Sequence, residues 1–136
     1  HPFTIDGWVL LPNDLHCIWT QQEDDSNFGI RWAMIKHFIT KRCGPDLCRN
    51  DWMNASKWKR NGSTLWQRRF CEHMIRDEDD FNKHMNYIHF NPVKHGLVTY
   101  VKDCPHSTFH RCVKRGFYPP DWGGVGTDTN YADYGE

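Results

Sequence analysis

The sequence lacks an apolar segment long enough to cross a membrane, since no apolar run approaches the roughly 20 residues that a membrane helix requires. Its N-terminal residues also lack the basic start and apolar core of a secretory signal. No internal repeat or low-complexity stretch is present. We therefore expect a globular cytoplasmic protein that does not bind membranes.

The sequence also lacks net charge, because 17 basic residues balance 17 acidic ones. Bulk charge therefore does not indicate a nucleic-acid-binding protein. The charges are nevertheless segregated, since six basic residues share one stretch with a single acidic residue, Glu72. These six are Lys57, Lys59, Arg60, Arg68, Arg69 and Arg76. The stretch is either a basic binding face or a solvated surface loop, and composition leaves both open.

A disulfide framework is not indicated, although the sequence contains six cysteines. There is no secretory signal, and 136 residues exceed the size of typical disulfide-stapled miniproteins, so we expect reduced thiols. Cys43 and Cys48 are separated by four residues in a Gly-Pro segment, a spacing that a zinc site tolerates. No second closely spaced pair follows, because seven residues separate Cys104 from Cys112. Structural zinc stays an alternative.

The length suits one domain with a modest core. Aromatic residues make up 15% of the chain and offer large side chains for packing or base stacking. We expect a single domain over residues 1–122 and a flexible tail over residues 123–136.

Two β-rich runs at the start of the chain predict a hairpin. The run from Phe3 to Leu11 alternates and then becomes continuously apolar, and a second run spans Leu15 to Thr20. A Pro-Asn-Asp turn separates them. Asp14 and His16 are two residues apart, so we expect them on the same face of the sheet.

The next segment predicts a helix that is capped by Ser26 and ended by Gly44 and Pro45. Its apolar residues recur at helical spacing: Phe28, Trp32, Ile35 and Ile39. Residues 45–64 show no clean period and are rich in Asn, Gly and Ser, which predicts a long surface loop.

The second half predicts a third strand and two more helices. Leu65 to His73 alternates like a strand. The acidic run 77–80 favours the start of a helix with the core residues Phe81, Met85 and Ile88, which Pro92 ends or kinks. A short helix near residues 107–115 is closed by Gly116. The resulting order predicts an α+β fold, with an antiparallel sheet covered by helices on one face.

The candidate chemistry centres on Tyr87 and Asn91, which are four residues apart and so share one helix face. Tyr87 is offset from the predicted core stripe. A tyrosine attacking phosphorus needs a polarised phosphate, which a metal ion provides. Asp14, His16 and Asn91 offer oxygen and nitrogen ligands for Mg²⁺ or Mn²⁺. On spacing alone, a tyrosine on a helix is more often a half-buried packing residue.

The motifs around these residues resemble the REP-associated tyrosine transposases. The segment GWVLLPNDLHCIWT resembles their metal-binding strand, and WQRRFCEHMIRDEDDFNKHMNYIHFNPVKHGLV resembles their nucleophile helix and its flanks. The resemblance runs from Pro2 to about Trp122.

This family belongs to the HUH endonucleases, which are named for two metal-binding histidines flanking a hydrophobic residue. The resemblance implies a ferredoxin-like fold, a nucleophile at Tyr87, and metal ligands at His16 and Asn91. It also implies attack on single-stranded DNA beside palindromic hairpin repeats, with a 5′-phosphotyrosine link and a free 3′-hydroxyl as products.

The sequence departs from the family pattern at two places. Asp14 stands where the family has the first histidine, and a carboxylate either keeps a hard cation bound or misplaces it. The leading strand and helix of the family are also missing before His1, so we expect a sheet that is short of one strand.

We expect single-stranded or hairpin DNA as the partner of a monomeric protein. The predicted DNA-contacting residues are Lys57, Lys59, Arg60, Arg68, Arg69, Lys94 and His95. Adjacent positions on a strand face opposite sides, so only one of Arg68 and Arg69 is expected to share a face with the site. Two alternatives stay open: a remnant that binds hairpin DNA without cleaving it, and a small zinc-stabilised interaction domain.

Overall fold

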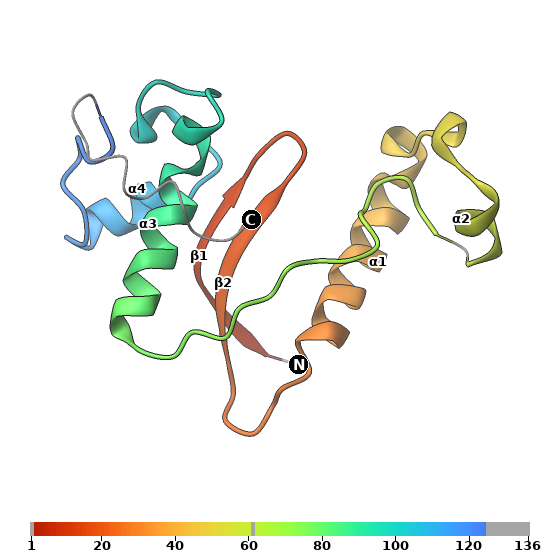
Figure 1. The fold of residues 1–136 in the computed structure, drawn as a ribbon, viewed down its shortest axis with the longest axis horizontal. Helices are drawn as coiled ribbons and strands as arrows, with labels where there is room; N and C mark the ends of the chain where they lie inside the picture. The colour runs from red at the N-terminus through yellow and green to blue at the C-terminus, as the bar shows by residue number, and fades with distance from the viewer. Residues whose placement is uncertain (1, 61, 125–136) are drawn as a thin grey trace. The chain divides into compact units, whose positions relative to one another are not determined.

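The computed structural model describes residues 2–60 and 62–124, which divide into two compact units (Figure 1). Among the described residues, unit 1 runs from Glu23 to His73, and unit 2 combines residues 2–22 with residues 74–124. Of the predicted tail, residues 125–136 lie outside the described residues, and the prediction of one domain over 1–122 stays a prediction.

Unit 2 is built around an antiparallel hairpin of β1 (Phe3–Leu10) and β2 (Leu15–Gln21), which confirms the predicted hairpin. Val9 stands opposite His16 in its register, and the ladder shifts at a bulge between Ile5 and Gly7. The segment around Ser107 lies along the other edge of β1, where Ser107 bridges Val9. Its Thr108 amide donates to the Trp8 carbonyl at 3.0 Å.

Helix α3 (Glu78–Lys94) packs against both strands of the hairpin (Figure 1). Asp77 caps it, because its carboxylate accepts a hydrogen bond from the Asp80 amide at 2.8 Å and satisfies an otherwise free N–H group. On the hairpin side, Ile88 joins a core cluster with Val9 and Leu11.

The segment after α3 forms a second core cluster against the same helix. It contains the 3₁₀ helix η2 (Val101–Asp103) and helix α4 (Phe109–Lys114). Phe90 of α3 packs there with Val101 and Phe109. The predicted short helix is confirmed, and Gly116 follows it with φ +80°, a conformation that glycine adopts without steric cost.

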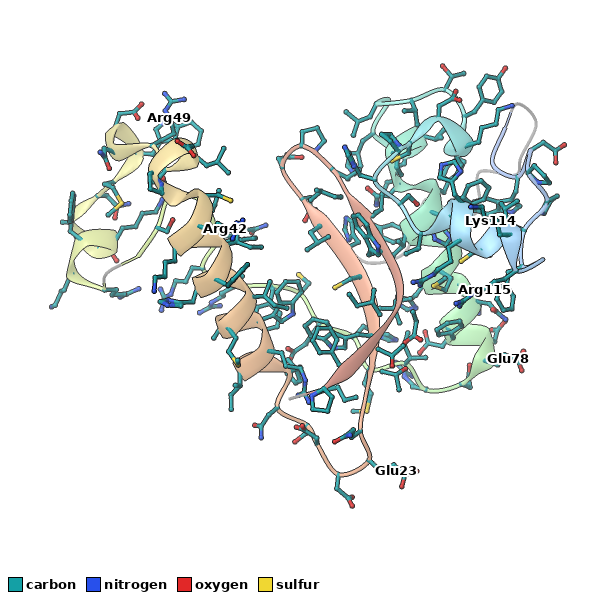
Figure 2. The ribbon with its side chains drawn as sticks, turned by 180° about the vertical axis from the view of Figure 1, so that it is seen from behind. Glu23, Arg42, Arg49, Glu78, Lys114 and Arg115 are labelled. Atoms are coloured by element: carbon teal, nitrogen blue, oxygen red, sulfur yellow. The ribbon has the colours of Figure 1, made fainter. Side chains whose placement is uncertain are left out.

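Unit 1 contains α1 (Phe28–Leu47), the 3₁₀ helix η1 (Asn50–Trp52) and α2 (Ala55–Lys59). The buried Arg31 side chain is fixed by Asp25, whose carboxylate lies 2.5 Å from the guanidinium. Arg42 and Arg49 extend from this unit as exposed basic side chains (Figure 2). No helix among the described residues has the length and apolar character needed to span a membrane.

The predicted end of the first helix is wrong, because α1 continues through Gly44 and Pro45 to Leu47. The proline removes one backbone donor, but the helical bonding resumes where the Cys48 amide donates to the Gly44 carbonyl at 2.8 Å. The predicted loop over 45–64 is wrong in part, since it contains η1 and α2. The cap position is Asn27 rather than Ser26, and its side chain makes no cap hydrogen bond.

The predicted strand over Leu65 to His73 is also wrong, because this segment has no regular structure. Its side chains pack on α1 instead: Trp66 donates its indole N–H to Thr40 Oγ1 at 2.9 Å, and the Phe70 ring lies against Trp32.

Of the two outcomes predicted at Pro92, an end of the helix at Asn91 is wrong, because α3 includes Pro92, which is fully buried. The fold is α+β, with a two-stranded antiparallel sheet and four α-helices in the described part of the chain.

Candidate active site

Tyr87 lies in the core of unit 2, between α3 and the hairpin. Its side chain is 5% exposed and packs with Val9, Leu11 and Cys104. The expectation that Tyr87 is offset from the core stripe is wrong, because α3 is covered on two sides, by the hairpin and by the segment after the helix. The Tyr87 ring meets the His16 ring of β2 edge-on, with centroids 5.5 Å apart at 88°.

Asn91 lies one turn after Tyr87 and is completely buried. Neither its amide oxygen nor its amide nitrogen has a hydrogen-bond partner among the described residues, and the same is true of the Tyr87 hydroxyl. Buried polar atoms are almost always paired, so several unpaired atoms on one helix face need an explanation. A ligand that binds at this face supplies one.

Asp14 and His16 lie together at the turn end of β2. A carboxylate oxygen of Asp14 lies 3.3 Å from His16 Nε2, and the side chains are 44% and 24% exposed. The other Asp14 oxygen accepts a hydrogen bond from the Leu15 amide at 2.8 Å, which fixes the carboxylate. The structure thus brings Asp14, His16 and Tyr87 into one chain of contacts.

Lys94 extends the helix face that carries Tyr87 and Asn91, because residues at i, i+4 and i+7 align along a helix. Its ammonium lies 5.2 Å from the centroid of the Tyr87 ring, within the range of a cation–π contact. His95 follows it as the exposed C-terminal cap residue of α3. A positive charge therefore stands next to the tyrosine.

The other predicted DNA-contacting residues belong to unit 1. Lys57 and Lys59 are in α2, Arg60 caps it, and Arg68 and Arg69 lie exposed in the irregular segment after it. Arg68 and Arg69 do not lie on opposite faces of a strand, as expected from the sequence, because this segment forms no strand.

His89 is a buried residue of this helix that the sequence did not single out. It is completely buried, and its Nε2 lies 2.9 Å from Thr108 Oγ1. Burial lowers the pKa of His89 to about 4, with a smaller contribution from the positive charge of Arg111, so His89 is neutral at pH 7. Its contacts come from residues about 20 positions away, and no spacing rule reveals them.

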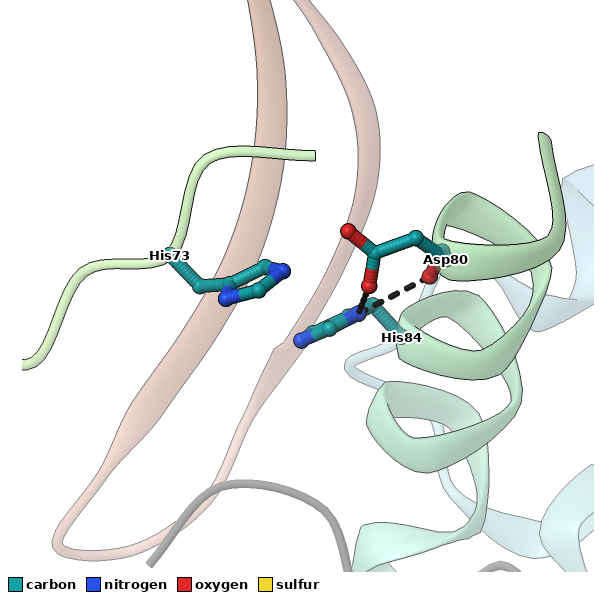
Figure 3. Close-up of side chains that lie close together, drawn as sticks. All are labelled: His73, Asp80 and His84. Carbon is teal, nitrogen blue, oxygen red and sulfur yellow. Dashed lines mark hydrogen bonds and ion pairs between the residues drawn. The ribbon is translucent and has the colours of Figure 1, made fainter. Parts of the chain in front are cut away.

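Outside this site, other side chains of the kinds that bind metals are a His–Asp pair in α3 and the cysteines. His84 contacts the Asp80 carboxylate at 3.1 Å and the Asp80 carbonyl at 2.8 Å within the first turns of α3 (Figure 3). His73, which the figure also labels, belongs to unit 1, whereas Asp80 and His84 belong to unit 2.

All six cysteines are free, as expected for reduced thiols, and burial raises the pKa of the Cys17 thiol to about 11.

The zinc alternative gains no support from Cys43 and Cys48. Among residues 2–60 and 62–124, these thiols do not gather with other His, Cys, Asp or Glu ligands into a group of three. Cys48 Sγ instead lies 3.2 Å from Ser63 Oγ.

No family model matches the sequence. The chain is 46% identical over 127 residues to the REP-associated tyrosine transposase of Escherichia coli, covering 93% of this chain and 67% of that protein. The chain belongs to the REP-associated tyrosine transposase family. A putative REP-associated tyrosine transposase of Haemophilus influenzae is 45% identical over 124 residues, covering 91% of this chain and 69% of that protein.

A solved structure of a REP-associated tyrosine transposase bound to a REP hairpin shares the fold of this family member. The TM-score is 0.74 at 45% sequence identity, and the match covers 96% of this chain and 68% of that chain. The expected α+β fold class is therefore confirmed. The name of this family refers to a tyrosine, so Tyr87 and its neighbours Asn91 and His16 are the residues to consider for its chemistry.

Proposed function

We propose that this chain cleaves and rejoins single-stranded DNA at REP-type hairpin sequences, with Tyr87 as the nucleophile, and acts as a monomer. The observation that carries the proposal is the Tyr87 hydroxyl, which is buried beside His16 and, like the Asn91 amide one turn later, has no hydrogen-bond partner among the described residues. Membership of the transposase family supports the same role, and the related structure bound to a REP hairpin supports hairpin DNA as the partner.

A divalent cation such as Mg²⁺ or Mn²⁺ fits the donor groups at this face. Asn91 offers a buried amide oxygen with no hydrogen-bond partner among the described residues, Asp14 a carboxylate, and His16 an imidazole nitrogen. Oxygen donors with one imidazole suit Mg²⁺ and especially Mn²⁺. A bound ion would polarise the scissile phosphate and stabilise the charge that develops on it.

In the proposed transesterification, Tyr87 is the nucleophile and Lys94 contacts the phosphate. The Tyr87 oxygen attacks phosphorus and gives up its proton to water, while the bond from phosphorus to the 3′-oxygen breaks and that oxygen takes up a proton. The products are a 5′-phosphotyrosine and a 3′-hydroxyl. Lys94, whose ammonium lies over the Tyr87 ring, is placed to contact a phosphate oxygen next to the nucleophile.

Burial of the Tyr87 hydroxyl sets a condition on this reaction. The side chain is 5% exposed, so DNA binding has to displace covering atoms before a phosphate reaches the oxygen. This burial, together with Asp14 in place of a histidine, favours a second candidate function: a protein that binds hairpin DNA but no longer cleaves it. The two candidates differ in whether Tyr87 becomes linked to DNA.

In the test, the whole chain is incubated with a 3′-labelled single-stranded oligonucleotide that carries a REP hairpin, in the presence of Mg²⁺ or Mn²⁺, because the 3′ part of the DNA stays linked to Tyr87. Cleavage predicts a labelled protein adduct that survives denaturation and is lost in Tyr87→Phe. Tyr100→Phe is the matched control, because Tyr100 is 38% exposed and lies outside the site. Its adduct yield should equal that of the wild type.

Three other results discriminate the alternatives. Hairpin binding without adduct supports the second candidate, and adduct formation in Asp14→His would then locate the defect at Asp14. Adduct that persists in Tyr87→Phe excludes Tyr87 as the nucleophile. A folded protein that neither binds nor cleaves the oligonucleotide refutes both DNA-directed functions, and tightly bound zinc in that sample would favour an interaction domain instead.

A further inference from the structure

A buried polar contact joins α3 to β1 on the side of the helix opposite Tyr87. His89 is two residues after Tyr87, which rotates it by about 200° around the helix axis. Its Nε2 lies 2.9 Å from Thr108 Oγ1, and both residues are buried. The His89 ring is also held edge-on by the Phe109 and Tyr118 rings, with centroids 5.8 Å and 5.2 Å away.

Thr108 connects this histidine to the backbone of β1 at a single residue. Its hydroxyl accepts a hydrogen bond from the Trp8 amide at 2.9 Å and donates to the Trp8 carbonyl at 3.2 Å. A hydroxyl has one proton, so with that proton on the Trp8 carbonyl, His89 must donate through Nε2–H. The Nε2-protonated tautomer of His89 follows from these contacts.

The strand that receives this contact also sets the position of His16. Val9 follows Trp8 directly and stands opposite His16 in the β1–β2 ladder. A short chain of contacts thus runs from His89 through Thr108 and Trp8 to the strand pair that carries His16. The other side of the same helix presents Tyr87 to His16.

Two neighbouring contacts show that α3 and β1 fit closely at this place. A Cβ on Gly7 would lie 2.4 Å from Met85 Sδ, so the bulge glycine permits the close approach of the helix one turn before His89. Arg111 donates to the Ile5 and Asp6 carbonyls at 2.9 Å and 2.8 Å, which holds the bulge in place. The His89 contact therefore belongs to a fixed register between helix and strand.

We propose that His89 and Thr108 are positioning residues that set the rotation of α3 so that Tyr87 faces His16. This role rests on the proposed function of Tyr87 for its catalytic meaning, although the geometric part stands without it. Catalytic groups must be held within about 0.5 Å and 10–20° of their productive arrangement. A misplacement of about 1 Å costs roughly a hundredfold in rate.

Substitutions at Thr108 test the role with little change of shape. Thr108→Val removes the hydroxyl and keeps the branching, whereas Thr108→Ser keeps the hydroxyl and loses a methyl group. Thr99→Val is the matched control, because Thr99 is exposed. Thermal unfolding of each variant establishes that it is folded at the assay temperature.

Two measurements report the position of Tyr87. The first is the ring-current displacement of the His16 and Tyr87 ring protons in the NMR spectrum of the DNA-free protein, which depends on their edge-on contact and not on activity. The second is the rate of adduct formation on a labelled REP-hairpin oligonucleotide at saturating DNA, measured beside the dissociation constant for that oligonucleotide.

We expect Thr108→Val to lose the ring-current displacement and to form adduct about 10- to 100-fold more slowly, with a hairpin dissociation constant within about twofold of the wild type. Thr108→Ser and Thr99→Val should retain both properties. Unchanged ring-current displacement in folded Thr108→Val overturns the proposal, as does a Thr108→Ser variant that behaves like Thr108→Val.

Two further outcomes are a Thr108→Val variant that does not fold and a wild type that forms no adduct. If Thr108→Val does not fold, His89→Gln and His89→Met replace it: the glutamine keeps an N–H donor and should retain the displacement, while the methionine should lose it. Equal behaviour of this pair overturns the proposal. If the wild type forms no adduct, the proposed function fails, and the NMR comparison alone still decides whether His89 and Thr108 position Tyr87.

Discussion

Replacement of Asn91 by leucine tests the idea that this buried amide faces a ligand. Leucine has the same branching at Cγ, with two methyl groups in place of the amide oxygen and nitrogen. Asn91 is fully buried, and neither amide atom has a hydrogen-bond partner among the described residues. A buried polar group that is left unpaired costs about 1–3 kcal/mol, whereas the apolar isostere removes that cost.

The expected effect of Asn91→Leu in the metal-free protein is therefore a gain in stability. Two unpaired atoms are removed, while the larger methyl groups strain a packed core by about 1–3 kcal/mol. We expect the free energy of unfolding in the presence of a chelator to rise by about 1 kcal/mol. The matched control is Asn86→Leu, since Asn86 Oδ1 accepts a hydrogen bond from the Tyr118 hydroxyl at 2.7 Å. Loss of that bond should destabilise by about 1 kcal/mol, the opposite sign.

Adding Mn²⁺ should reverse the order of wild type and Asn91→Leu. A ligand that binds the folded state at 100 times its dissociation constant stabilises by about 2.7 kcal/mol, and the variant lacks a ligand atom. The assay is urea unfolding followed by circular dichroism and tryptophan fluorescence, whose transitions must coincide. Destabilisation of Asn91→Leu by more than about 1 kcal/mol in chelator would refute the reasoning, because the amide would then have a partner in the free protein.

Two further predictions concern the scaffold. Gly7→Ala should destabilise by about 1–3 kcal/mol, because its Cβ would lie 2.4 Å from Met85 Sδ, and a double-mutant cycle should show that the cost shrinks in a Met85→Ala background. An equal cost in both backgrounds contradicts the contact. The hydrogen bond from Arg31 lowers the pKa of Asp25 from 3.8 to about 2, so its contribution to stability is present above about pH 4 and is lost as the pH falls towards 2. Asp25→Asn should remove that pH dependence in an unfolding series from pH 2 to 5, and an identical loss of stability in the variant contradicts the assignment.

The parts of the fold that the sequence predicted correctly are those whose signal is local. The hairpin follows from alternating side chains around a Pro-Asn-Asp turn, and the start of α3 follows from the acidic run at Asp77. Both features depend on residues within about one turn or one strand pair. The short helix α4 and its closing Gly116 belong to the same class.

The failed predictions share a dependence on distant packing. Leu65 to His73 alternates as a strand does, but a strand forms only when another edge supplies hydrogen bonds, and Trp66 and Phe70 pack on α1 instead. Pro45 and Pro92 stand inside helices because each removes only one hydrogen bond, and burial of Pro92 holds the last turn of α3 in place. Local rules give no measure of that burial.

The residues of the candidate site could be predicted from the sequence, but their burial and their contacts could not. The motif around Tyr87 pointed to Asn91 and His16, and the structure places the Tyr87 and His16 rings 5.5 Å apart. The burial of Tyr87 was not predictable, since it results from long-range packing against Val9 and Leu11 of the hairpin region and Cys104 of the segment after α3. His89 was missed for the same reason.

The three buried polar residues of α3 separate into two kinds by their partners. His89 Nε2 is bonded to Thr108 Oγ1, which links it to the backbone of β1, whereas His89 Nδ1 has no hydrogen-bond partner among the described residues. Tyr87 and Asn91 have no such partners among the described residues, although they lie in the same two turns. A fold gains nothing from burying an unpaired amide and an unpaired hydroxyl, because each costs about 1–3 kcal/mol. Such a cost is typical of groups whose partner is a ligand, which is why we propose a ligand at Tyr87 and Asn91 and a positioning role for His89.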